Sequence, residues 1–197
     1  TAFIVRDDSD PTKLVMSWLG AGCDATSIKA WNAELEAAGV KSIVSFGGES
    51  FGGYYLQNDE QKNAFIADVK KIIDDYGFTG LDADIESGGI KTMDGTLVGE
   101  AMKEIKDGYV SQGVDFWLTA APEFPYLTGP SSKWKTDFYV KMFNAAGMDE
   151  FAYVWVQSQK DLCRASLTEF LDDLIAVDGL DTIECAGKVH FSPIGFE

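Results

Sequence analysis

The chain has 197 residues, enough for one domain with a sizeable core, and its hydrophobic content of 46% excludes an intrinsically disordered protein. With 16 Lys and Arg residues against 32 Asp and Glu residues, its formal net charge is −16 at pH 7. Such a charge repels phosphate backbones and anionic lipids, and no run of about 18 apolar residues is present, so we expect binding to neither nucleic acid nor membranes.

Seven short apolar runs, rich in β-branched and aromatic residues, are typical of buried strands. In chain order they span residues 2–5, 14–18, 42–46, 80–86, 116–121, 153–156 and 189–191.

Stretches with helical periodicity separate these strands. They span residues 27–38, 61–76, 97–110, 135–146 and 166–177, and each is followed closely by glycine, the residue that most easily ends a helix. In the first of them Ile28, Trp31 and Leu35 recur three and four residues apart, which predicts one apolar face.

Alternating strands and helices predict an α/β fold with a parallel sheet and helices outside it. A doubly wound sheet usually has a glycine-rich loop after its first strand, and no Gly-x-Gly-x-x-Gly occurs here, which favours a closed barrel. A full (β/α)8 barrel of the TIM type takes about 250 residues. We therefore expect residues 1–197 to form a single barrel domain of this type that is incomplete at one or both ends.

The segment 80–86 carries three acidic residues at alternate positions. Because strand side chains alternate between faces, Asp82, Asp84 and Glu86 share one face. Carboxyl groups crowded inside a barrel raise at least one pKa, which keeps an acid protonated near neutral pH. Glu86 stands at the carboxyl end of the strand, where barrel enzymes have their active sites, so we predict a general acid with Asp84 as its proton partner.

Two other interpretations of these carboxylates stay open. They could be solvated side chains of an edge strand, although the apolar residues between them and the helical flanks argue against it. They could also hold a divalent cation, since hard metals prefer oxygen ligands. Cys23, Cys163 and Cys185 form no Cys-x-x-Cys pair and His190 is the only histidine, so we expect no zinc site, and the disulfide state stays open.

Four segments resemble the barrel motifs of family 18 glycoside hydrolases, the chitinases. Residues 79–86 (TGLDADIE) resemble the signature Asp-Gly-x-Asp-x-Asp-x-Glu, with Thr79 in place of the first Asp. Residues 42–48 (SIVSFGG) are similar to the Ser-x-Gly-Gly strand upstream of it. Residues 118–126 (LTAAPEFPY) resemble the fifth strand of bacterial members, and residues 153–157 (YVWVQ) resemble the sixth strand with its Gln.

The resemblance implies endo-acting, retaining hydrolysis of β-1,4-linked N-acetylglucosamine polymers, with the substrate's own acetamido group as nucleophile. It makes Glu86 the acid, Asp84 the residue that orients and stabilises the acetamido group, and Asp82 its deeper proton partner. It implies no metal or cofactor, chitin or chitooligosaccharides as the partner, and a secreted protein. The substrate contacts that it implies are Tyr126, Gln157, Trp155, Trp18, Glu123, Gly47 and Gly48. Of these, Trp18, Trp155 and Tyr126 are expected to expose aromatic faces for stacking on sugars.

The chain departs from the family pattern at its sixth strand and its ends. Gln159 and Lys160 stand where the family has Tyr and Asn, and Tyr153 or Tyr126 could replace that Tyr. Residues 2–5 resemble the second strand of the family and residues 189–193 the seventh, which leaves the first and eighth outside the chain. Alternatively, residues 14–18 form a full strand and only one is missing.

Two other functions fit the same motifs. A catalytically weak, chitinase-like carbohydrate-binding protein would share the barrel, and an endo-β-N-acetylglucosaminidase would share the acidic strand. Binding relatives usually lose the terminal Glu or the second Asp, so the presence of Glu86, Asp84 and Asp82 favours an enzyme.

Overall fold

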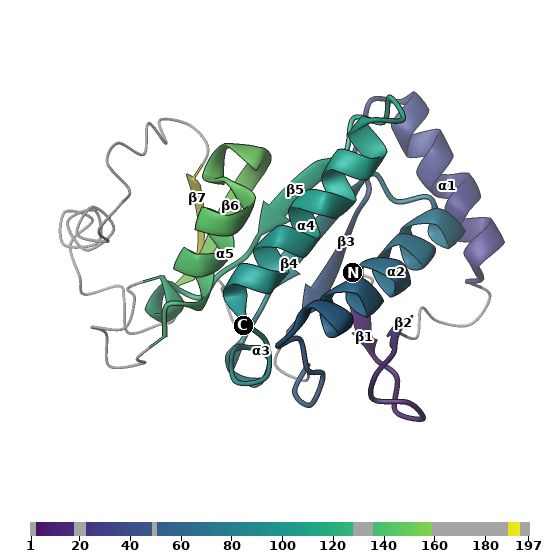
Figure 1. Cartoon of the computed structure of the whole chain (residues 1–197). Coiled ribbons are helices and arrows are strands. Elements are labelled where there is room, and N and C mark those ends of the chain that lie inside the picture. Colours follow the sequence, from purple (N-terminus) through teal and green to yellow (C-terminus); the bar gives the residue numbers. More distant parts are fainter. Residues whose placement is uncertain (1–2, 18–22, 49–50, 128–135, 159–188, 194–197) are drawn as a thin grey trace.

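The computed structural model describes residues 3–17, 23–48, 51–127, 136–158 and 189–193, and these form one sheet covered by helices (Figure 1). The sheet has the strand order β2-β1-β3-β4-β5-β6-β7. Its strands are β1 (Phe3–Arg6), β2 (Leu14–Met16), β3 (Ile43–Gly47), β4 (Gly80–Asp84), β5 (Trp117–Ala120), β6 (Phe151–Ser158) and β7 (Val189–Pro193). All seven predicted strands are confirmed within a few residues.

Every neighbouring pair from β1 and β3 through β7 is parallel, whereas β2 pairs antiparallel with β1. The alternative in which residues 14–18 form a full barrel strand is therefore wrong. A barrel strand runs parallel to its neighbours, but Leu14–Met16 is the short return arm of a hairpin.

The helices begin and end close to their predicted positions. They are α1 (Ala25–Ala37), α2 (Asp59–Tyr76), α3 (Ser87–Ile90), α4 (Gly95–Val110) and α5 (Phe138–Ala146), with 3-10 turns η1 (Phe124–Tyr126) and η2 (Met148–Glu150). Side chains of Asp24, Asn58 and Asp94 accept backbone N–H groups at the starts of α1, α2 and α4. The helix predicted over residues 166–177 lies outside the described residues.

Figure 1 shows α1, α2, α4 and α5 on the same side of the sheet. The core lies between them and the sheet, with Leu81, Ala83 and Leu118 fully buried there. A doubly wound sheet has helices on both faces. Within the described residues the arrangement is therefore that of part of a β/α barrel, as predicted.

Helix α1 follows the prediction of an apolar face only in part, because Ile28 is half-buried against the core but the other two residues are exposed. Trp31 is 51% exposed and Leu35 is 40% exposed. Polar contacts also attach the helix to α2, because Asn32 donates to the carbonyl of Tyr76 at 2.8 Å and Lys29 to that of Asp74 at 2.6 Å.

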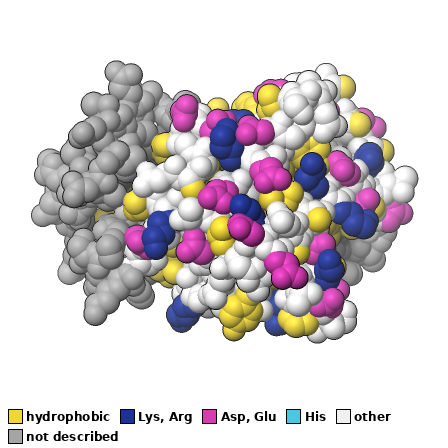
Figure 2. Space-filling view, in the orientation of Figure 1, with side chains coloured by type: hydrophobic (Ala, Val, Ile, Leu, Met, Phe, Trp, Pro, Cys, Tyr) yellow, Lys and Arg dark blue, Asp and Glu magenta, His cyan; other side chains and the backbone are white. Residues whose placement is uncertain are grey.

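The helix-covered face carries charges of both signs (Figure 2). Ion pairs such as Lys62 with Glu100 at 2.7 Å and Lys103 with Glu150 at 2.9 Å join neighbouring elements across it. Among the described residues, no helix has the length and apolar character needed to cross a membrane.

On the opposite face of the sheet, alternate side chains of β4, β5 and β6 point away from the helices. In a barrel this face is the interior. It carries Asp82 and Asp84 from β4, Thr119 from β5, and Tyr153, Trp155 and Gln157 from β6.

Candidate active site

Strand β4 carries the acidic residues to the carboxyl edge of the sheet. It ends at Asp84, two residues before the predicted end, and α3 begins at Ser87. Glu86 precedes α3 with an extended backbone, φ −104° and ψ −171°, and its carboxylate does not cap the helix. Because Ile85 is fully buried on the helix side and Glu86 is extended, the alternation of side chains continues past the strand.

Asp82 is the deepest of the three carboxylates and lies in a row of hydroxyl groups. Ser45 of β3 donates to one carboxylate oxygen at 2.8 Å, and Thr119 of β5 donates to the other at 2.6 Å. The register sets this row, since Asp82 is paired with Ser45 on one side and with Thr119 on the other. Burial raises the pKa of Asp82, and the two hydroxyl groups partly offset the rise.

Asp84 lies nearer the edge and is held by Gln157 of β6, whose side-chain amide donates to it at 2.7 Å. Burial, followed by the neighbouring charge of Asp82, raises the pKa of Asp84 to about 6, while the Gln157 hydrogen bond opposes the rise and Glu123 adds to it. The side-chain amide of Gln157 also donates a hydrogen bond to the backbone carbonyl of Ala121 at 2.6 Å. Both amide hydrogens are thus used inside the site, and only the side-chain oxygen is left for a substrate.

Gly47 and Gly48 let β3 approach the end of β4 closely. Gly47 has φ +118°, and a Cβ there would lie 2.0 Å from the backbone oxygen of Asp84. The N–H of Gly48 donates to that same oxygen at 2.5 Å. The two glycines therefore fix the backbone of Asp84, which is a role beyond the predicted substrate contact.

Glu123 and Tyr126 approach the acidic strand from the segment after β5. Glu123 pairs through its backbone with Gln157. Burial raises the pKa of Tyr126 to about 12, and the carboxylates of Glu123 and Glu86 add to the rise. The Tyr126 hydroxyl is thus a protonated group close to the predicted acid.

The predicted aromatic platform is confirmed in part. Trp155 is 36% exposed and stacks on Tyr153, with ring centroids 5.6 Å apart. Tyr126 is only 7% exposed, so its prediction as an open stacking face is wrong: the ring packs into the core. Trp18 lies outside the described residues.

Of the two candidates for the missing family Tyr, Tyr153 is too deep on β6. It is paired with Thr119, level with Asp82, and its ring lies against Trp117 at 5.6 Å. Tyr126 is the better placed of the two, because the charge of Glu86 contributes to the raised pKa of its hydroxyl group.

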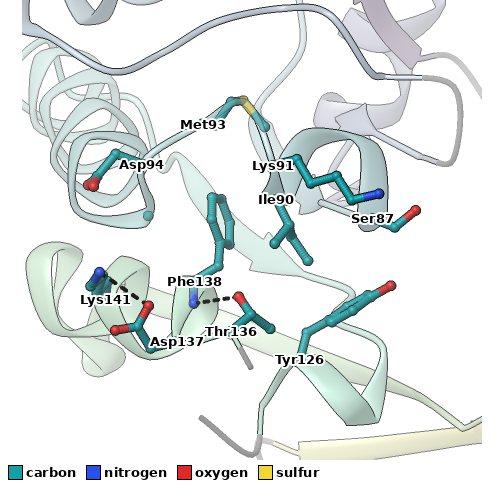
Figure 3. A pocket seen from close by; sticks show the side chains of 11 residues that line it. Ser87, Ile90, Lys91, Met93, Asp94, Tyr126, Thr136, Asp137, Phe138 and Lys141 are labelled. Atoms are coloured by element: carbon teal, nitrogen blue, oxygen red, sulfur yellow. Dashed lines mark hydrogen bonds and ion pairs between the residues drawn. The ribbon is translucent and has the colours of Figure 1, made fainter. Parts of the chain in front are cut away.

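A cavity of about 450 Å³ is lined at one side by Ser87, the residue that follows Glu86 in the chain. Figure 3 shows Ile90 from α3 and Phe138 from α5 pointing into the space between the two helices, with Tyr126 at one side. The walls are mixed: they combine apolar side chains with the polar side chains of Ser87, Lys91, Asp94, Thr136, Asp137 and Lys141. Among the described residues, no group of three or more His, Cys, Asp or Glu side chains is arranged to hold a metal ion.

The family model of glycosyl hydrolases family 18 matches residues 4–159, which include the whole acidic strand and its neighbours. The chain belongs to this family.

Proteins similar to this chain are chitinases by name. One from Enterococcus faecalis is 28% identical over 180 residues, which cover 84% of this chain and 51% of the relative. Chitinase ChiA from Flavobacterium johnsoniae is 40% identical over 111 residues, which cover 48% of this chain and 7% of the relative. The chain thus spans about half of the first protein's length and a small part of the second.

The solved structures agree on the fold. The crystal structure of a family GH18 chitinase from Chromobacterium violaceum superposes with a TM-score of 0.64 at 26% identity, covering 79% of this chain and 41% of that one. A second, described as putative Chitinase A from Streptomyces coelicolor, gives 0.60 at 24% identity over 49% of its chain. The fold is the TIM barrel of family 18, of which this chain forms a part.

Three residues at this family 18 site were not predicted as site residues. Ser45 and Thr119 could have been found from strand register, because both lie on the inner face beside Asp82. Tyr139 of α5, which contacts the backbone between Asp84 and Glu86, could not, because nothing in the sequence pairs this helix with β4.

Proposed function

We propose that this chain carries the catalytic centre of an endo-acting, retaining hydrolase of chitin or chitooligosaccharides. The observation that supports it most is the placement of Asp84, a carboxyl group with a pKa of about 6 between Asp82 and Glu86 on the inner face of a family 18 barrel.

In the first step, Glu86 gives its proton to the glycosidic oxygen, and the bond from that oxygen to C1 breaks. The carbonyl oxygen of the substrate's 2-acetamido group forms a new bond to C1, which gives a cyclic oxazolinium ion. The leaving sugar departs as an alcohol, and Glu86 is left as a carboxylate.

In the second step, the Glu86 carboxylate takes a proton from water, and the water oxygen attacks C1. The ring opens, the acetamido group is restored, and the product keeps the β configuration. Asp84 accepts a hydrogen bond from the acetamido N–H and stabilises the positive charge of the intermediate. Gln157 holds the Asp84 carboxylate in place for this task.

Asp82 accepts the proton that Asp84 gives up when the charged intermediate forms. The two hydroxyl groups on Asp82 hold it in one orientation beneath Asp84. Two interacting carboxyl groups titrate as a pair, and burial raises the pKa of both Asp82 and Asp84, which favours one proton passing between them.

The cavity that begins at Ser87 is our candidate for the leaving-group side of the substrate. Its lining includes Ser87, the residue after the acid, and its mixed polar and apolar walls suit the hydroxyl groups and the apolar faces of a sugar. A site that continues past the scissile bond permits cleavage inside a polymer, which supports endo action. Because polymeric chitin cannot cross a membrane, the proposal includes secretion.

The test is hydrolysis of N-acetylglucosamine hexamer, followed by ¹H NMR of the first products. We expect internal cleavage with the new reducing end in the β form, and Glu86→Gln to lower the rate by about 10²–10⁴. Glu104→Gln, at an exposed position of α4, is the matched control and should keep the parent rate.

Three outcomes would contradict parts of the proposal. Turnover of Glu86→Gln close to the parent would remove Glu86 as the acid. Binding of the hexamer without hydrolysis by the parent would favour a carbohydrate-binding protein. Release of intact glycans from glycoproteins, without hydrolysis of the hexamer, would favour an endo-β-N-acetylglucosaminidase.

A further inference from the structure

Tyr139, on helix α5, lies outside the carboxylate row but contacts the backbone that carries it. Its side chain is fully buried. The Tyr139 hydroxyl accepts the backbone N–H of Ile85 at 2.7 Å and lies 3.0 Å from the carbonyl oxygen of the same residue. Ile85 is the residue between Asp84 and Glu86.

The single phenolic proton has two possible acceptors. The carbonyl of Ile85 is 3.0 Å away and that of Ala83 is 3.4 Å away. The Ala83 carbonyl already accepts the N–H of Ala121 at 2.9 Å. The proton therefore goes to Ile85, and one hydroxyl group satisfies both polar backbone groups of this residue.

The contact between Tyr139 and Ile85 lies directly beyond the end of the β3–β4 pairing. Strand β4 pairs with β3 as far as Asp84, whose carbonyl accepts the N–H of Gly48. Beyond that point Tyr139 holds Ile85 from the helix layer. The backbone of Asp84 is thus fixed from β3 and that of Ile85 from α5, directly before Glu86 in the chain.

Helix α5 is itself held tightly against α4. A Cβ on Gly95 would lie 2.2 Å from the carbonyl oxygen of Phe138, and one on Gly99 would lie 2.2 Å from that of Met142. The two helices therefore approach to backbone contact at Phe138, directly before Tyr139, and at Met142, about one turn after it. A hydroxyl group on so rigid a support fixes the groups that it contacts.

We propose that Tyr139 is a positioning residue for the catalytic pair, which sets the distance and angle between the Asp84 and Glu86 carboxyl groups through the backbone of Ile85. This inference rests on the proposed function of that pair. Burial raises the pKa of the Tyr139 phenol well above its usual range, with the charges of Asp84, Asp82 and Glu86 adding to the rise, so the hydroxyl keeps its proton at every pH of interest.

The experiment is Tyr139→Phe, which removes only the hydroxyl group. A small misplacement of a reacting group costs up to about 10² in rate. We expect kcat on chitooligosaccharides to fall by about 10²-fold with KM nearly unchanged. The pH profile of kcat should also shift, because the spacing of the two carboxyl groups has changed.

Tyr109→Phe is the matched control. Tyr109 is also a buried helical tyrosine, and its hydroxyl donates to Asp74 at 2.7 Å on the outer helices. It should keep the parent kcat and pH profile. Equal losses in the two variants, or a loss in Tyr139→Phe that only tracks its unfolded fraction with no shift of the profile, would overturn the proposal.

Amide hydrogen exchange of the unchanged protein provides a second test that needs no variant. The Ile85 amide should exchange as slowly as those of Leu81 and Ala83 in the paired strand. Fast exchange at Ile85 would overturn the proposal even if Tyr139→Phe did not fold. If the parent hydrolysed no chitooligosaccharide, the proposed function would fail while slow exchange at Ile85 still supported the tyrosine contact.

Discussion

Replacing Asp84 with Asn should make the protein more stable at neutral pH while it removes most of the activity. Asn has nearly the same shape as Asp and can still accept the hydrogen bond that Gln157 donates at 2.7 Å. The substitution therefore removes a charge and a titrating proton with little change in packing.

The size of the stability gain follows from the pKa of Asp84. A rise from 3.8 to about 6 corresponds, at about 1.4 kcal/mol per pKa unit, to an upper limit of about 3 kcal/mol. Asp84 is only partly buried, so solvent screens part of this energy. We expect Asp84→Asn to raise the free energy of unfolding by about 1–2 kcal/mol at pH 7.5.

The stability gain of Asp84→Asn over the parent protein should increase as the pH rises. Because the pKa of Asp84 is higher in the folded state, its protonated form contributes stability that is fully present below pH 3.8 and is lost as the pH rises through about 6. The uncharged variant does not lose this contribution. The difference in unfolding free energy between variant and parent should grow between pH 4 and pH 7.

Urea denaturation of both proteins from pH 4 to pH 7.5 measures this difference, and Asp8→Asn, at a side chain that is 98% exposed, is the control. In parallel, hydrolysis should fall by about 10²–10³, as when another preorganised stabilising group is removed, while calorimetric binding of a chitooligosaccharide survives. A stability difference that stays constant with pH would refute the electrostatic reasoning. Equal losses of binding and rate would give Asp84 another role.

Two further predictions concern the neighbours of the acidic strand. Gly47→Ala should lower the free energy of unfolding by about 3 kcal/mol or more, because it combines φ +118° with a clash against the Asp84 carbonyl. Gly39→Ala, at φ +76° in open space, should cost only about 1 kcal/mol, and similar losses in the two would contradict the clash. Thr119→Val should lower stability by about 1–3 kcal/mol in denaturant titrations, since it removes the 2.6 Å bond to Asp82. That loss should be greater at pH 7 than at pH 4, because the hydroxyl favours ionised Asp82, and a loss independent of pH would show that the bond does not depend on the charge.

Local patterns in the sequence were enough to predict most of the fold. Each of the seven strands is a short apolar run, and the core-facing stripe of α2, including Phe65 and Val69, follows helical spacing. The direction of β2 was not predictable, because an apolar run of three residues is the same whether it pairs parallel or antiparallel. The exposure of Trp31 was missed for a related reason, since periodicity shows a face but not what covers it.

The candidate site also has features that the sequence predicted and features that only the folded chain shows. The alternation of Asp82, Asp84 and Glu86 predicted one shared face, and the burial of side chains alternates through Glu86 although the strand ends at Asp84. Gln157 was predicted at the site as a substrate contact, but only the folded chain shows both of its amide hydrogens in use. Tyr139 depends on the packing of α5 against β4, which is a contact between residues 54 positions apart, so no local pattern could reveal it.

The weak attachment of α1 has a consequence for local unfolding of the protein. Of its residues only Asn32 is buried, whereas α2 and α4 each bury a stripe of apolar side chains. Regions with few buried apolar contacts unfold locally at a low free-energy cost, independently of the rest. Helix α1 can therefore detach while the sheet stays intact. Because the hydrogen bonds that it would lose reach the end of α2, the carboxylates of β4 would keep their positions.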